Sequence, residues 1–171
     1  MIEALVPVWV QVSSIVAPFI AGGVALMTYF FFKHQHQANG LFEAFKILNT
    51  EQHRNARTTV YRLYRTYLEN RDLNIFFVDD VRRVRADYDQ MGTMIRARSI
   101  NKKQFLRQYG ASAYLCWKFL EDHIQHEREL RNFLPFMTDF EWLVQQAIRY
   151  WQSQGEDLSK IRIHEDGVVI S

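Results

Sequence analysis

The first part of the sequence contains the feature that most constrains this chain. From Ala4 to Phe32, 29 consecutive residues include no Asp, Glu, Lys, Arg or His, and the run ends at Lys33. A bilayer hydrocarbon core about 30 Å thick is crossed by about 20 apolar residues in helical form. The sequence therefore predicts a transmembrane helix over residues 12–33, preceded by a short extracytoplasmic segment over residues 1–11.

A cleaved signal peptide is the main alternative for an apolar run at this place. Such a peptide has a basic start, an apolar stretch of about 7–15 residues and small residues at its cleavage site. Here the only charge before the run is Glu3, and the run ends in Tyr29-Phe30-Phe31-Phe32, where a peptidase requires small side chains. We therefore expect a retained single-pass anchor.

The charges that flank the apolar run predict its orientation. Lys and Arg next to a membrane helix are held on the cytoplasmic side. The N-terminal flank has neither residue, whereas Lys33 and Lys46 follow the run. The single cysteine, Cys116, cannot form a disulfide within the chain, which agrees with a reducing compartment. The expected location is the inner (cytoplasmic) membrane, with the N-terminus outside and the C-terminal domain in the cytoplasm.

Small residues recur at helical spacing along one face of the predicted membrane helix, whereas the opposite face is bulky and includes Ile20. Lipid tails solvate a Leu or Phe as well as a protein does, but small residues let a second helix approach closely. We therefore expect integral membrane protein subunits as partners. The small-residue strip that would contact them consists of Ser14, Ala17, Pro18, Ala21, Gly22 and Ala25.

The rest of the chain predicts one helical domain. Residues 34–40 are polar and predict a short linker, and residues 41–171 are enough for one compact domain. Apolar residues recur at helical intervals in five segments, for which Thr50, Asn101 and Thr138 are candidate N-caps. The expected fold class is all-α, with an N-terminal transmembrane helix followed by a bundle of about five helices.

The tail has a different pattern. Ile161-Arg162-Ile163 alternates apolar and basic residues, Asp166-Gly167 is a turn signal, and Val168-Val169-Ile170 has the composition of a returning strand. The tail therefore predicts a small C-terminal β-hairpin. Because an isolated hairpin is marginal in water, it would have to lie on the helices or on a partner.

Charge is divided unevenly along the domain. Residues 33–107 contain 15 basic and 8 acidic side chains, whereas residues 108–171 contain 6 basic and 10 acidic ones. Basic residues near an anionic lipid surface gain about 1 kcal/mol each. We expect the basic half to face anionic lipids or a partner, and nucleic acid is the less favoured alternative because the arginines alternate with acids. The expected contacts are Lys33, Lys46, Arg54, Arg57, Arg62 and Arg65.

No motif in the sequence carries catalytic chemistry. His123 and His126 lie three residues apart with Asp122 and Glu127 beside them, but no second motif completes a metal site, so a solvated polar face is expected. Cys116 lies among apolar residues and is expected in the core. There is no Gly-rich phosphate loop and no nucleophile motif. We expect no enzyme activity, no metal and no cofactor, and the sequence identifies no small-molecule substrate.

Four spaced motifs carry a family resemblance. They are Ala56-Arg57-x-x-Val60-Tyr61, Tyr109-Gly110-x-Ser112, Trp117-Lys118-x-Leu120 and His126-Glu127-Arg128. In these motifs the chain resembles a widespread bacterial family of unknown function. The resemblance implies one N-terminal membrane helix and a small all-helical cytoplasmic domain over most of residues 12–151, with the terminal hairpin outside it. It implies an architecture, and no activity or functional residue.

Two functions stay open. The first is a non-catalytic accessory or structural subunit of a larger membrane protein complex, respiratory or photosynthetic or similar. Aromatic residues make up 15 % of the chain, and exposed aromatics favour protein interfaces. The second is a free-standing, membrane-tethered sensor or defence-type effector that binds a small ligand or nucleic acid. Stoichiometric partners on co-purification would support the first, and a monomer or homo-oligomer the second.

Overall fold

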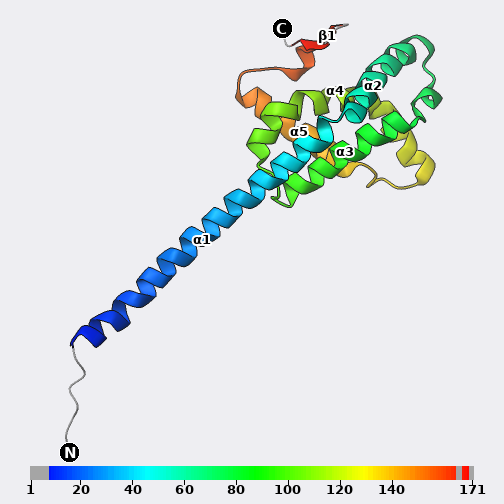
Figure 1. Cartoon of the computed structure of the whole chain (residues 1–171). Coiled ribbons are helices and arrows are strands. Elements are labelled where there is room, and N and C mark those ends of the chain that lie inside the picture. The colour runs from blue at the N-terminus through cyan, green and yellow to red at the C-terminus, as the bar shows by residue number, and fades with distance from the viewer. Residues whose placement is uncertain (1–7, 165–166, 170–171) are drawn as a thin grey trace, which may run out of the picture.

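The computed structural model describes the backbone of residues 8–164 and 167–169, and the side-chain surroundings of residue 17 and of residues 19–161. A long helix projects from a bundle of four further helices (Figure 1). The helices are α1 (Val8–Leu48), α2 (Glu51–Asn70), α3 (Asp79–Arg96), α4 (Lys102–Arg131) and α5 (Thr138–Ser153), with the short 3-10 helices η1 (Leu73–Phe76) and η2 (Leu158–Lys160).

Two three-residue strands lie near the C-terminal end. Strand β1 (Arg162–His164) pairs antiparallel with β2 (Gly167–Val169), with Ile163 opposite Val168. Asp166, on which the predicted turn depends, lies outside the described residues. Apart from this short pair, the regular structure described is helical, so the all-α fold class is confirmed.

Helix α1 is one continuous rod of 41 residues. At 1.5 Å per residue it extends about 60 Å, and only its C-terminal end joins the bundle (Figure 1). Residues 34–40 continue the helix, so the linker expected there does not form. The segment contains no proline, its Gln and Ala residues have good helix propensity, and extending an existing helix avoids the cost of a new nucleus.

The predicted transmembrane span needs correction. Within the part of the chain that the structure describes, no helix is long and apolar enough to cross a membrane. The uncharged stretch with described side-chain surroundings runs from Phe19 to Phe32, and α1 then continues through Lys33 into the bundle. A bilayer core requires about 20 apolar residues. This finding overturns the span at residues 12–33, the single-pass architecture and the inner-membrane location inferred from them.

The last turns of α1 attach it to the bundle. Ala44 and Leu48 are fully buried, and the Phe45 ring lies 5.5 Å from the Tyr109 ring of α4. Gly40 lies directly against the backbone of Ser99, in the connection between α3 and α4. A β-carbon at position 40 would collide with the Ser99 carbonyl group. Glycine therefore permits the close approach that fixes where α1 leaves the domain.

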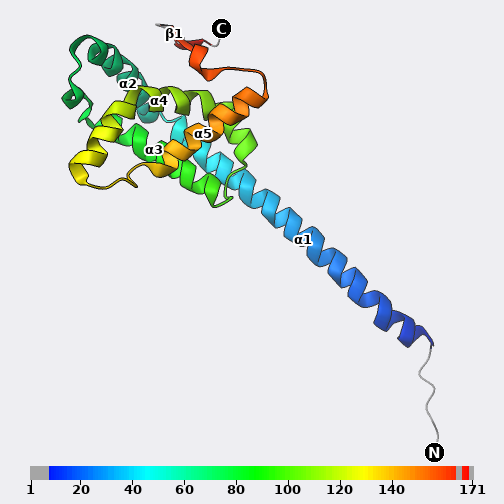
Figure 2. The same ribbon diagram turned by 180° about the vertical axis from the view of Figure 1, so that it is seen from behind.

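The centre of the bundle is aromatic and lies among α3, α4 and α5. Tyr88 stacks on Phe140 with ring centroids 5.2 Å apart, and Trp117 contacts the Phe140 ring edge-on, also with centroids 5.2 Å apart. Helix α5 lies against both α3 and α4 (Figure 2). Gly92 of α3 allows α5 to approach closely, because a β-carbon there would collide with the Asp139 carbonyl group.

The helix N-termini agree with two of the three predicted caps. The Thr50 side chain accepts a hydrogen bond from the His53 amide, and Asn101 accepts one from the Gln104 amide. Thr138 is already the first residue of α5. The residue before it, Met137, has a left-handed backbone with φ of 59° and makes no side-chain cap, so the cap predicted at Thr138 is wrong.

Candidate functional site

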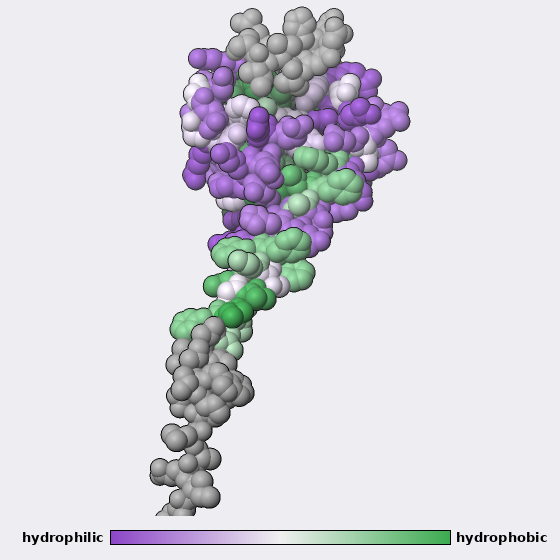
Figure 3. Space-filling view, turned by 60° about the vertical axis from the view of Figure 1, so that its left-hand side comes forward, coloured by the Kyte–Doolittle hydropathy of each residue, from purple (hydrophilic) through white to green (hydrophobic). Residues whose placement is uncertain are grey.

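The projecting part of α1 exposes a large apolar surface. Phe19, Met27 and Phe31 are 78 %, 77 % and 67 % exposed, and the residues from Phe19 to Phe32 are all exposed. Figure 3 shows this apolar surface as a mostly green zone, with some near-white residues, below the largely purple bundle. A folded protein rarely leaves so large a contiguous apolar surface uncovered unless it binds something.

The predicted small-residue strip lies on this projecting segment. Ala17, Ala21, Gly22 and Ala25 are exposed, and nothing lies within 4 Å of a β-carbon built on Gly22. The side-chain surroundings of Ser14 and Pro18 lie outside the described residues. The four described members of the strip are therefore accessible to a second helix, and no part of their own chain that the structure describes covers them.

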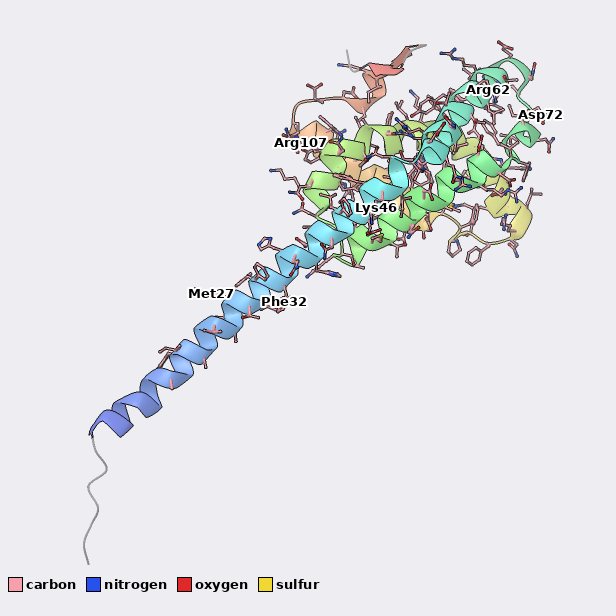
Figure 4. The ribbon with its side chains drawn as sticks, in the orientation of Figure 1. Met27, Phe32, Lys46, Arg62, Asp72 and Arg107 are labelled. Atoms are coloured by element: carbon pink, nitrogen blue, oxygen red, sulfur yellow. The ribbon has the colours of Figure 1, made fainter. Side chains whose placement is uncertain are left out.

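The predicted basic contacts do not gather on one surface. Lys33, Arg54 and Arg65 are exposed. Lys46 is also exposed and pairs with Glu43 at 2.9 Å. Figure 4 shows Lys46 where α1 meets the bundle and Arg62 toward the end of the bundle away from the projecting helix.

Arg57 turns inward, although the sequence predicts it among the basic contacts at the surface. Its Nη1 donates a hydrogen bond to Ser112 Oγ at 2.7 Å, and the same Oγ lies 2.8 Å from the Tyr88 hydroxyl. The Cys116 thiol lies 3.9 Å from the Tyr61 hydroxyl beside them. We call these five residues, which come from α2, α3 and α4, the Arg57 cluster.

Arg57 is the only formal charge in the Arg57 cluster at neutral pH. Burial raises the pKa values of the Tyr61 and Tyr88 hydroxyls, and burial raises the pKa of the Cys116 thiol to about 12. These groups therefore stay protonated and neutral. Among the described residues, no carboxylate lies within ion-pair distance of the Arg57 guanidinium, and its Nε is buried without a hydrogen-bond partner.

His123 is a further buried polar side chain, and it lies apart from the Arg57 cluster. The expectation of a solvated face is wrong here, because His123 is 0 % exposed and packs against the rings of Phe76 and Phe77. Burial and the nearby Arg85 guanidinium lower the pKa of His123 to about 4, so its ring is neutral at pH 7. Neither ring nitrogen has a hydrogen-bond partner in the described structure.

Carboxylates compensate the two other arginines in the interior. Arg85 pairs with Glu127, and both side chains are almost fully buried. Arg128 donates to Glu141 at 2.8 Å and to the Phe136 carbonyl at 2.8 Å. Within the residues described, no three His, Cys, Asp or Glu side chains gather as a metal-binding group.

Sequence reasoning missed the pairing of His53 with Asp87. His53 is fully buried, and its Nδ1 lies 2.6 Å from an Asp87 carboxylate oxygen on α3. The residues are 34 positions apart, so no local spacing reveals the contact. The one local indication is that His53 lies on the apolar face of α2, one turn before the buried Ala56, which favours a buried histidine with a polar partner.

The chain is an all-helical bundle with a projecting N-terminal helix. It belongs to a family described as a domain of unknown function (DUF4760), whose model matches residues 15–147. The match includes the projecting part of α1 and the whole Arg57 cluster, and it ends before η2 and the strands. This match agrees with the resemblance to a family of unknown function that the sequence motifs carry. It gives no support to the membrane helix or to the bacterial origin that the resemblance also implies. No curated protein and no solved structure matches the chain.

Proposed function

We propose that this protein is a non-catalytic accessory subunit that attaches to a larger protein complex through the projecting part of α1. The observation that carries the proposal is the exposed apolar segment from Phe19 to Phe32, which extends away from the bundle. Burying apolar surface stabilises an association by about 25 cal/mol per Å² removed from water. A rod of this length cannot fold back onto its own domain while α1 stays one helix.

The two faces of α1 favour a helix as the binding partner. Ala21, Gly22 and Ala25 leave room for a second backbone to approach closely, and the aromatic side chains beside them supply contact area. The close packing of Gly40 against the Ser99 backbone supports the same role, because it joins the base of the projecting helix directly to the bundle. In this proposal the complex binds α1, and the bundle extends from the site of attachment.

Co-purification of the tagged full chain from its native cells in mild detergent tests the proposal. We expect a stoichiometric protein partner with the unmodified chain. Gly22→Leu and Ala21→Phe place bulk in the small-residue strip and should release the partner. Ile20→Leu is the matched control, because Ile20 is 62 % exposed and keeps nearly the same volume.

Two results would oppose the proposal. A chain that purifies as a monomer or homo-oligomer would favour a free-standing sensor or effector that binds a small ligand or nucleic acid. Equal recovery of the partner with all three variants would show that the small-residue strip takes no part in the attachment.

A further inference from the structure

The Arg57 cluster differs from the other buried basic sites of this protein. Arg85 pairs with Glu127, and Arg128 pairs with Glu141, so each of these arginines meets a carboxylate. Arg57 is half-buried, and its hydrogen bond in the described structure goes to a neutral hydroxyl. A charge withdrawn from water is costly unless an opposite charge compensates it. Among the described residues, carboxylates compensate Arg85 and Arg128, whereas none forms an ion pair with Arg57.

The side chains around Arg57 are suited to a negative ligand. Ser112, Tyr61 and Tyr88 each carry a hydroxyl, and no acceptor-only group belongs to the cluster. In the contact between Ser112 and Tyr88 one hydroxyl donates to the other, so the Tyr61 hydroxyl and one of these two can donate to a ligand. Tyr88 and Cys116 are fully buried and form its inner wall. Arg57, Tyr61 and Ser112 are only half-buried, so each of these residues keeps part of its surface in contact with solvent.

We propose that the Arg57 cluster is a binding site for a single carboxylate group, with the Arg57 guanidinium as the charged contact and the neighbouring hydroxyls as additional donors. One positive charge matches one carboxylate, whereas a phosphate dianion usually meets several cations or a row of backbone amides. The ligand is a small organic acid or the carboxylate of an acidic peptide. The site is independent of the attachment proposed for α1.

Nuclear magnetic resonance of the isolated full chain in mild detergent tests this assignment. The backbone amides of Arg57, Tyr61 and Ser112 are followed while sodium acetate replaces sodium chloride at constant ionic strength. We expect a saturable shift of these signals. Two further titrations use inorganic phosphate and a short peptide with one Asp side chain and blocked termini. Tighter binding of the peptide than of acetate would identify a peptide ligand, and equal or weaker binding a small acid.

Variants separate a specific site from a general salt effect. Arg57→Gln should weaken acetate binding at least ten-fold, and Ser112→Ala, which keeps the charge, should weaken it several-fold. Arg62→Gln is the matched control on the exposed face of the same helix and should bind as the unmodified chain does. If Arg57→Gln does not fold, Ser112→Ala and the unmodified chain decide the question.

The proposal is overturned by shifts that do not saturate, by unchanged affinity in Arg57→Gln or Ser112→Ala, or by phosphate binding that is tighter than acetate binding. None of these measurements involves a protein partner. Failure of the proposed attachment through α1 would therefore leave them unaffected.

Discussion

Arg85 of α3 and Glu127 of α4 form an ion pair whose side chains are only 3 % and 5 % exposed. Arg131, one turn further along α4, reaches the second carboxylate oxygen of Glu127 at 3.3 Å. Burial alone would raise the pKa of Glu127, but the two guanidinium groups lower it below its ordinary value. The carboxylate therefore stays charged and joins two helices inside the bundle.

Removing one member of this pair should destabilise the protein strongly. Glu127→Ala leaves the Arg85 charge buried without compensation, at a cost of about 3–5 kcal/mol in the free energy of unfolding. The double variant Arg85→Met/Glu127→Leu should lie much closer to the unmodified protein. Lys46→Ala, which breaks an exposed pair, should cost less than about 1 kcal/mol. Urea unfolding monitored by circular dichroism measures all three, and an equal cost for Glu127→Ala and Lys46→Ala would refute the assignment.

Stability should depend on pH through His123. Its pKa is about 4 in the folded protein, against 6.5 for an ordinary histidine. Between these values the unfolded state binds the proton and the folded state does not, so stability is lost as the pH falls from about 6.5 to 4. The loss due to this residue amounts to about 3 kcal/mol.

The variant His123→Phe isolates this effect. Because the His123 ring makes no hydrogen bond in the described structure and lies between phenylalanines, Phe should be tolerated at pH 7. Urea unfolding at pH 7, 5.5 and 4 should show a shallower pH dependence for the variant than for the unmodified protein. Parallel curves would mean that His123 does not remain neutral when folded.

Two glycines of α1 should respond in opposite ways to the same substitution. Gly40→Ala places a β-carbon against the Ser99 backbone and should cost about 1–3 kcal/mol through overpacking. Gly22→Ala meets open space and should be neutral or stabilise the helix by up to about 1 kcal/mol. Thermal unfolding of both variants provides the comparison. Similar melting temperatures would show that α1 does not rest on Ser99.

Local patterns predicted most of the helices but not their environment. The caps at Thr50 and Asn101 and the core position of Cys116 follow from spacing of neighbouring residues, and the structure confirms them. The polarity of residues 34–40 predicts a break in α1, but the segment contains no proline and the helix continues through it, Gly40 included. The apolar run predicts a helix, which the structure confirms over the described residues, but its length predicts a membrane span that the described residues do not support.

The interior polar contacts were beyond local patterns because each joins distant segments. Arg57 meets Ser112 across 55 positions, and Arg85 meets Glu127 across 42. On a helix, Arg57 falls between the buried and exposed faces, and only the packing of α2 against α4 decides which way it turns. The same reason explains why His123 was expected in solvent.

Site-specific photo-crosslinking tests the central claim most directly. A photoreactive residue in place of Met27, which is 77 % exposed on α1, is compared in native cells with one in place of Arg62 at the far end of the bundle (Figure 4). Attachment through α1 predicts one discrete protein adduct from position 27 that position 62 does not give and that Gly22→Leu abolishes. Adducts with lipid alone from position 27, or the same products from both positions, would contradict it.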